Sequence, residues 1–65
     1  MLAQNIKKLR KQHKISQENL AKKAGITYST LIKLESGANS NPTVNTLKKV
    51  ADAFRISLDE LVGRK

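Results

Sequence analysis

The chain has 65 residues and no cysteine, which limits it to one domain and excludes disulfides and thiolate metal sites. Thirteen Lys and Arg against five Asp and Glu give a net charge of +8 and a sequence pI of about 10.2, a balance typical of nucleic-acid-binding domains. A single His and five scattered carboxylates form no catalytic or metal-binding constellation, so we expect no enzyme, no metal and no cofactor.

The sequence also argues against association with a membrane. No apolar run approaches the roughly 20 residues that a membrane-spanning helix needs. The residues after Met1 form neither the basic segment nor the apolar core of a secretory signal. Tyr28 and Phe54 are the only aromatic residues, which disfavours a helix lying on a membrane surface. We therefore expect a cytoplasmic protein.

The first predicted element is a helix from about Leu2 to His13. Leu2, Ile6 and Leu9 recur at the spacing of one helix face, so this face should pack on the core. Arg10 borders the same face. His13 lies at the end of the helix, where we expect it to be exposed or half-buried rather than a ligand or a catalytic group.

Residues Ser16 to Gly37 predict two short helices joined by a tight turn. Ser16 is a good N-cap for the first helix, and Thr27 for the second. Ala21 lies mid-helix, where a bulky residue would hold a crossing helix away. Gly25 lies at the turn, where a residue without a Cβ takes a positive φ at little cost. The inward-facing residues of this pair are Leu20, Ala21, Ala24, Leu31 and Leu34. This pattern is typical of a DNA-binding helix-turn-helix.

Two further helices complete the predicted fold. One begins at Thr43 or Val44 and ends near Phe54, and its apolar stripe consists of Val44, Leu47, Val50, Ala51 and Phe54. The last is short, with Ser57 as its N-cap and Glu60 three residues later completing a capping box. Its apolar positions are Leu58, Leu61 and Val62. Because no strand pattern occurs, the sequence predicts an all-α domain of five helices.

Segment 16–37 closely resembles the helix-turn-helix of the phage repressor and Cro family. Before this segment, Ile6, Leu9 and Arg10 resemble the family's first helix. After it, residues 41–42 and 46–47 and the run 56–61 resemble the fourth and fifth, so the resemblance covers nearly the whole chain. It implies a compact, lambda-repressor-like domain over residues 1–65, either complete in itself or the N-terminal part of a longer repressor. It also implies sequence-specific binding of double-stranded DNA at the nucleoid, most often to repress transcription.

A recognition helix of this kind enters the major groove with its N-terminal residues toward the base edges. The residues expected to face the bases are Thr27, Tyr28, Ser29, Ile32 and Lys33. Lys33 can donate to guanine O6 and N7, and Ser29 can donate or accept. Tyr28 can place its ring on a thymine methyl and its hydroxyl on a phosphate, and Ile32 can make a similar apolar contact. Each residue taken alone also fits an ordinary solvated helix face, but together within this motif they favour base contact.

The resemblance further implies phosphate contacts at both ends of the motif. Gln17 matches the family residue that bonds a phosphate and braces the recognition helix, and helix N-termini favour anions. Ser16 and Lys14 are expected to add contacts beside it. Lys14 stands where the family often has Gly, so a left-handed conformation there costs about 1 kcal/mol. The loop after residue 37 matches the family's phosphate-contacting loop but carries neutral residues, which are Asn39, Ser40 and Asn41.

An ion pair within the domain and a contact between two copies of it are also expected. The resemblance implies an ion pair between Arg10 and Glu35 beneath the recognition helix, where both residues border a core leucine. The last helix carries more apolar surface than one inner face requires, so we expect a homodimer, in solution or only on DNA, and a palindromic operator. The residues expected at the dimer interface are Arg55, Ile56, Leu58 and Asp59.

Two other functions stay open from the sequence. The fold also serves as a protein-interaction or antitoxin-like module, but such a module should lose Gln17 or carry acidic residues on the outward face of the second helix. This chain has Ser29 and Lys33 there, which suit base edges. A non-specific DNA coat would bind every duplex alike with a strong salt dependence.

Overall fold

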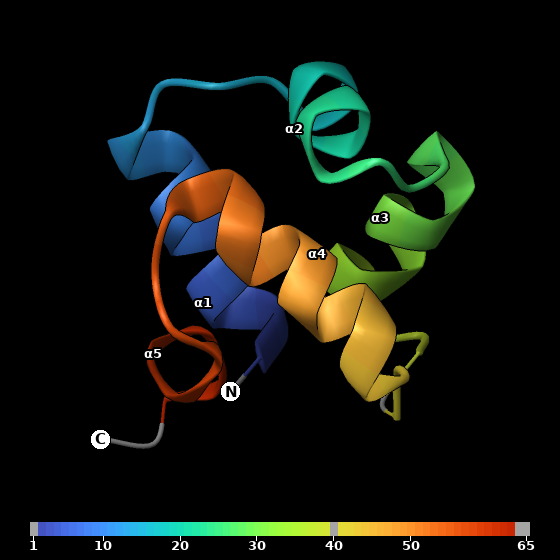
Figure 1. Cartoon of the computed structure of the whole chain (residues 1–65). Coiled ribbons are helices and arrows are strands. Elements are labelled where there is room, and N and C mark those ends of the chain that lie inside the picture. The colour runs from blue at the N-terminus through green and yellow to red at the C-terminus, as the bar shows by residue number, and fades with distance from the viewer. Residues whose placement is uncertain (1, 40, 64–65) are drawn as a thin grey trace.

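The structure is a computed structural model that describes residues 2–39 and 41–63. The described residues form five α-helices, α1 (Leu2–Gln12), α2 (Gln17–Ala24), α3 (Tyr28–Ser36), α4 (Val44–Phe54) and α5 (Leu58–Val62) (Figure 1). The predicted all-α fold of five helices is therefore confirmed, with helix bounds within one or two residues of those expected.

Hydroxyl side chains begin every helix after the first. The N-cap oxygens accept hydrogen bonds from backbone N–H groups three residues later at 3.1–3.2 Å, in the pairs Ser16–Asn19, Thr27–Thr30, Thr43–Thr46 and Ser57–Glu60. At Ser57 the capping box is complete, because the Glu60 carboxylate also accepts from the Ser57 backbone N–H at 3.2 Å. These caps satisfy donors that a helix cannot satisfy internally, which is why the helix starts were predictable from sequence.

Left-handed residues end the helices. Gly25, in the turn of the helix-turn-helix, has φ +72°, as expected for a residue without a Cβ. Lys14 also takes the left-handed conformation that was considered for this position, with φ +53°. Arg55 is a second case, not anticipated from the sequence, with φ +59° at the C-cap of α4. Both residues carry a Cβ, so each position stores about 1–2 kcal/mol of backbone strain.

The core lies where α1 packs on α3 and α5, and where α4 packs on α2 and α5. Its buried apolar residues are Ile6, Leu20, Ala21, Ala24, Leu31, Leu34, Val50, Ala51, Ala53, Phe54 and Leu61. The ring of the exposed His13 lies beside one of them, with its centroid 5.0 Å from that of Phe54. The expectation for Val44 was wrong, because its side chain is 62% exposed. It is the first residue of α4, at the end of that helix remote from α5 (Figure 1).

Candidate nucleic-acid interface

Helix α3 is anchored on one side and exposed on the other. Leu31 and Leu34 are buried against the core, while Ser29 and Lys33 are exposed and Ile32 is half-buried. α3 follows α2 through the turn at Gly25 and packs on both α1 and α2 (Figure 1). The second helix of the motif is thus packed against the core on one face, with a polar face left for a partner.

The expected base-contacting residues differ in how free their polar groups are. The Thr27 hydroxyl accepts from the Thr30 backbone N–H at 3.1 Å and lies 2.8 Å from the Thr30 hydroxyl, so it is occupied by the cap. Ser29 and Lys33 project from the exposed face one helical turn apart. We therefore regard Ser29 and Lys33 as the polar groups of α3 best placed to meet base edges.

Tyr28 is connected to the start of α2. Its side chain is 50% exposed, and its hydroxyl donates to Gln17 Oε1 at 3.4 Å. Gln17 in turn donates through Nε2 to Glu35 Oε1 at 3.1 Å. The first residue of α2 and the first residue of α3 are thus joined through side chains across the turn. The family resemblance implies that Gln17 braces the recognition helix, but sequence reasoning did not identify Tyr28 as a partner, because no local spacing brings positions 17 and 28 together.

Beneath these residues lies the expected pair of Arg10 and Glu35. Arg10 Nε is 2.9 Å from Glu35 Oε2, and Arg10 Nη2 is 3.3 Å from Glu35 Oε1. The Glu35 side chain is 3% exposed and that of Arg10 is 20% exposed. Arg10 Nη1 also donates to the Ile15 carbonyl at 3.3 Å. This forked arrangement neutralises a carboxylate that would be costly to bury alone, and it ties α1 to α3.

The residues expected to contact phosphates lie on both sides of the motif. Ser16 is exposed, and its hydroxyl caps α2 by accepting from the Asn19 backbone N–H. Lys14 is exposed just before it. In the loop after α3, Asn39 Oδ1 accepts from the Asn41 backbone N–H at 3.2 Å, which leaves the Asn39 side-chain amino group to donate. Ser40 lies outside the described residues.

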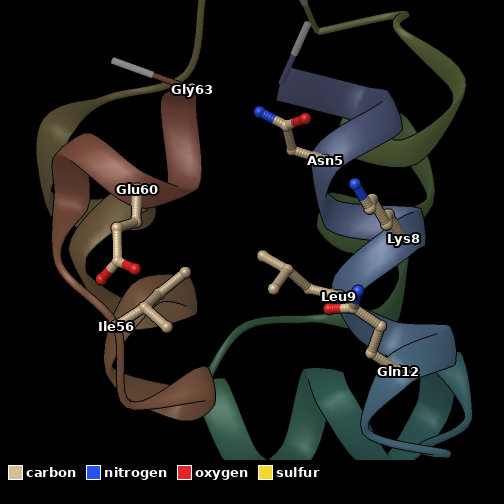
Figure 2. Close-up of a pocket in the computed structure, with 7 residues that line it drawn as sticks. All are labelled: Asn5, Lys8, Leu9, Gln12, Ile56, Glu60 and Gly63. Carbon is tan, nitrogen blue, oxygen red and sulfur yellow. The ribbon is translucent and has the colours of Figure 1, made fainter. Parts of the chain in front are cut away.

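The residues expected at a dimer interface lie together at the junction of α4 and α5. Arg55 and Asp59 are exposed, while Ile56 and Leu58 are half-buried. Beside them a groove of about 300 Å³ runs between α1 and α5, with Leu9 and Ile56 facing each other across it (Figure 2). This surface therefore offers both apolar area and charges of opposite sign.

The comparisons with known proteins agree with this geometry. The HTH_3 family model, described as helix-turn-helix, matches residues 6–61. The chain belongs to this helix-turn-helix family. The expected resemblance to the phage repressor and Cro type is thereby confirmed, and the chain is a domain of a regulator family rather than an enzyme family.

Relatives of this helix-turn-helix domain are named as transcriptional regulators and repressors. It is 35% identical over 65 residues to the HTH-type transcriptional regulator SinR of Bacillus subtilis, covering 100% of this chain and 59% of that protein. It is 38% identical over 64 residues to the immunity repressor protein of Bacillus phage phi105, covering 98% of this chain and 44% of that protein. It is 39% identical over 62 residues to the uncharacterized HTH-type transcriptional regulator YqaE of Bacillus subtilis, covering 95% of this chain and 53% of that protein.

The helix-turn-helix domain thus spans about half the length of these curated relatives. No helix among residues 2–39 and 41–63 combines the length and the apolar character that crossing a membrane demands.

Proposed function

We propose that this domain binds double-stranded DNA sequence-specifically, with α3 in the major groove, and that it represses transcription at the nucleoid. The observation that carries the proposal is the exposed pair Ser29 and Lys33 on a helix whose opposite face is fixed by the buried Glu35. A helix anchored in the core in this way holds its exposed side chains at defined positions against base edges, which a flexible surface cannot do. The net charge of +8 adds the non-specific attraction to phosphates.

The residues divide into base-reading and phosphate-binding groups. Lys33 donates to guanine O6 and N7, and Ser29 bonds an adjacent base edge. Gln17 has a second side-chain N–H besides the one directed at Glu35, and this N–H is free to donate to a phosphate at the start of α2. Ser16, Lys14 and the loop amides of Asn39 and Asn41 add contacts on either side. The phosphate contacts set the register of α3, and the base contacts set the sequence.

A salt titration on selected and random duplexes tests the proposal. A binding-site selection from random DNA identifies the preferred duplex, and fluorescence anisotropy then measures its affinity against a scrambled duplex at several salt concentrations. We expect the logarithm of affinity to fall linearly with the logarithm of salt, by about 0.9 per phosphate neutralised. We expect the preferred duplex to bind about 10³-fold or more tightly than the scrambled one. Equal affinity for both duplexes would instead identify a non-specific coat.

The rival function of a protein-interaction module makes a different prediction. In such a module the exposed face of α3 would not contact DNA. Substitution of Lys33 would therefore not change the affinity for any duplex. The polar outward face of α3, with its one cation at Lys33, and the hydrogen bond between Gln17 and Glu35 favour the DNA-binding function.

The second part of the proposal is a two-fold homodimer formed through the α4–α5 junction. Arg55 and Asp59 have opposite charges and lie in the sequence on either side of the half-buried Ile56 and Leu58, a pattern that would allow a self-complementary surface. In a two-fold interface Arg55 of one copy can therefore meet Asp59 of the other. The matching operator has two inverted half-sites about 34–36 Å apart. Sedimentation equilibrium with and without the selected duplex tests this, and a monomer bound to a site without inverted symmetry would contradict it.

A further inference from the structure

The exposed side of α3 carries two parallel rows of side chains. Tyr28 and Ile32 are four residues apart and form an apolar row, and Ser29 and Lys33 form a polar row beside it. At 3.6 residues per turn, the apolar row lies between the polar row and the buried Glu35. A major groove is wide enough to admit a helix together with its side chains, so both rows can face base edges at once.

The Tyr28 hydroxyl donates to Gln17 in this structure, which limits what this residue can recognise. A phenol has one proton, and Tyr28 donates it to Gln17 Oε1 at 3.4 Å. A phosphate oxygen can only accept, so Tyr28 cannot bond a phosphate while it holds Gln17. Apart from the phenol oxygen, which can still accept a hydrogen bond, its exposed surface is the aromatic ring, and the neighbouring Ile32 has no polar side-chain atom. The Tyr28–Ile32 row thus presents apolar surface to the groove.

The major groove contains one apolar feature that such a row can read, which is the C5-methyl group of thymine. We propose that the Tyr28–Ile32 row recognises pyrimidine C5-methyl groups, so that base methylation controls the affinity of this domain. It therefore distinguishes thymine from uracil, and it binds 5-methylcytosine better than cytosine at the same position. This inference rests on the proposed function, because it requires α3 to lie in the major groove.

The size of the effect follows from the burial of a single methyl group. Such burial changes an affinity by about fourfold. Exchange of thymine for uracil removes the methyl and retains every hydrogen-bonding atom of the base pair. A change from thymine to 5-methylcytosine retains the methyl but replaces the O4 acceptor with an N4 donor. Methylation of cytosine should therefore recover the apolar contact alone.

The experiment uses synthetic duplexes based on the selected site. Each thymine is replaced singly by uracil, and separately each T·A pair is replaced by C·G with either cytosine or 5-methylcytosine. Anisotropy at fixed salt gives the Kd of each duplex. We expect uracil to weaken binding about fourfold at one or two positions, and 5-methylcytosine to bind about fourfold more tightly than cytosine at those positions. Equal affinity for thymine and uracil at every position would overturn the proposal.

Substitutions test whether the Tyr28–Ile32 row causes the sensitivity of affinity to the C5-methyl group. In Ile32→Ala or Tyr28→Ala the thymine-to-uracil affinity ratio should fall toward one at the sensitive position, whereas Tyr28→Phe keeps the ring and should keep the ratio. Ser29→Ala, on the polar row, should weaken both duplexes alike and leave the ratio unchanged. If neither alanine substitution changes the ratio, with folding verified by circular dichroism, the row does not read the methyl. A selection that returns no preferred duplex contradicts the proposed function itself, whereas a preferred duplex insensitive to methyl removal contradicts only this inference.

Discussion

Gln17 donates through its side-chain amide to Glu35 Oε1 at 3.1 Å, which connects the N-terminus of α2 to the buried carboxylate of α3. The same oxygen accepts from Arg10 Nη2 at 3.3 Å. One carboxylate therefore neutralises a cation of α1 and orients the residue that we propose to bind phosphate. Substitutions around Glu35 should consequently affect stability and DNA affinity together, whereas substitutions at the exposed ends of this network should affect affinity alone.

The first prediction concerns the loss of Glu35. In Glu35→Ala the guanidinium of Arg10, which is 20% exposed, loses its partner. Removal of one member of a buried pair costs about 3–5 kcal/mol. A core of this size supplies about 3–5 kcal/mol in total. We therefore expect much of the Glu35→Ala population to be unfolded at room temperature even without denaturant. A urea titration followed by circular dichroism measures this fraction.

Two matched variants separate burial of the pair from a general effect of removing charge. The exposed Asp52→Ala should change the free energy of unfolding by no more than about 0.5 kcal/mol. The double variant Arg10→Met/Glu35→Leu leaves no stranded charge and should recover a good part of the loss. A Glu35→Ala melting temperature within a few degrees of the parent would show that the pair contributes little.

The second prediction separates sequence reading from phosphate binding. Lys33→Ala should cost about 1–3 kcal/mol on the selected duplex and relax preference at one or two base positions. Gln17→Ala should weaken selected and scrambled duplexes alike, because phosphates carry no direct sequence information. Both effects can be measured by repeating the binding-site selection with each variant. If Gln17→Ala altered the selected sequence and Lys33→Ala did not, the two roles would be exchanged.

Local signals explain why so much of the fold was predictable. The cap at Thr27 and the positive φ of Gly25 depend on a few neighbouring residues, and both are present as expected. The Arg10–Glu35 pair joins positions 25 residues apart, and it was expected only because the whole chain resembles a known family.

Features that depend on packing between distant segments were not predictable. Val44 fits the apolar spacing of α4, but nothing in that spacing shows that the packing partners of α4 leave its first residue exposed. The bond from Tyr28 to Gln17 arises from the crossing of α2 and α3, which periodicity within either helix does not fix. The strained Arg55 was missed because its left-handed conformation follows from the path into α5.

The third prediction uses the strained position at Lys14. With φ +53°, Lys14 should gain from replacement by Gly, although Gly also increases the entropy of the unfolded chain. We expect Lys14→Gly to raise the free energy of unfolding by about 0.5–1 kcal/mol. Lys14→Ala removes the same charge but keeps a Cβ, so it should show no comparable gain. If the two variants were equally stable in urea titrations, the charge rather than the backbone would determine stability at this position.

The same pair of variants also reports on DNA binding. Lys14→Gly and Lys14→Ala both remove one positive charge from the proposed phosphate surface. Each should therefore reduce the salt dependence of affinity by about one phosphate contact, although only Lys14→Gly relieves the backbone strain. A salt slope identical to that of the parent in both variants would remove Lys14 from the phosphate-binding group.

The last prediction concerns the proposed two-fold interface at Arg55 and Asp59. Two-fold symmetry forms the Arg55–Asp59 contact twice, so Arg55→Glu places four carboxylates where two ion pairs stood. We expect Arg55→Glu, and separately Asp59→Arg, to weaken dimer formation on a two-half-site duplex by about tenfold. The double variant Arg55→Glu/Asp59→Arg restores opposite charges and should regain most of the parent affinity. Binding of each variant to a single half-site serves as the control, since it needs no second copy and shows whether α3 is intact. Additive losses in the double variant, with half-site binding unchanged, would show that the two residues do not meet across a dimer interface.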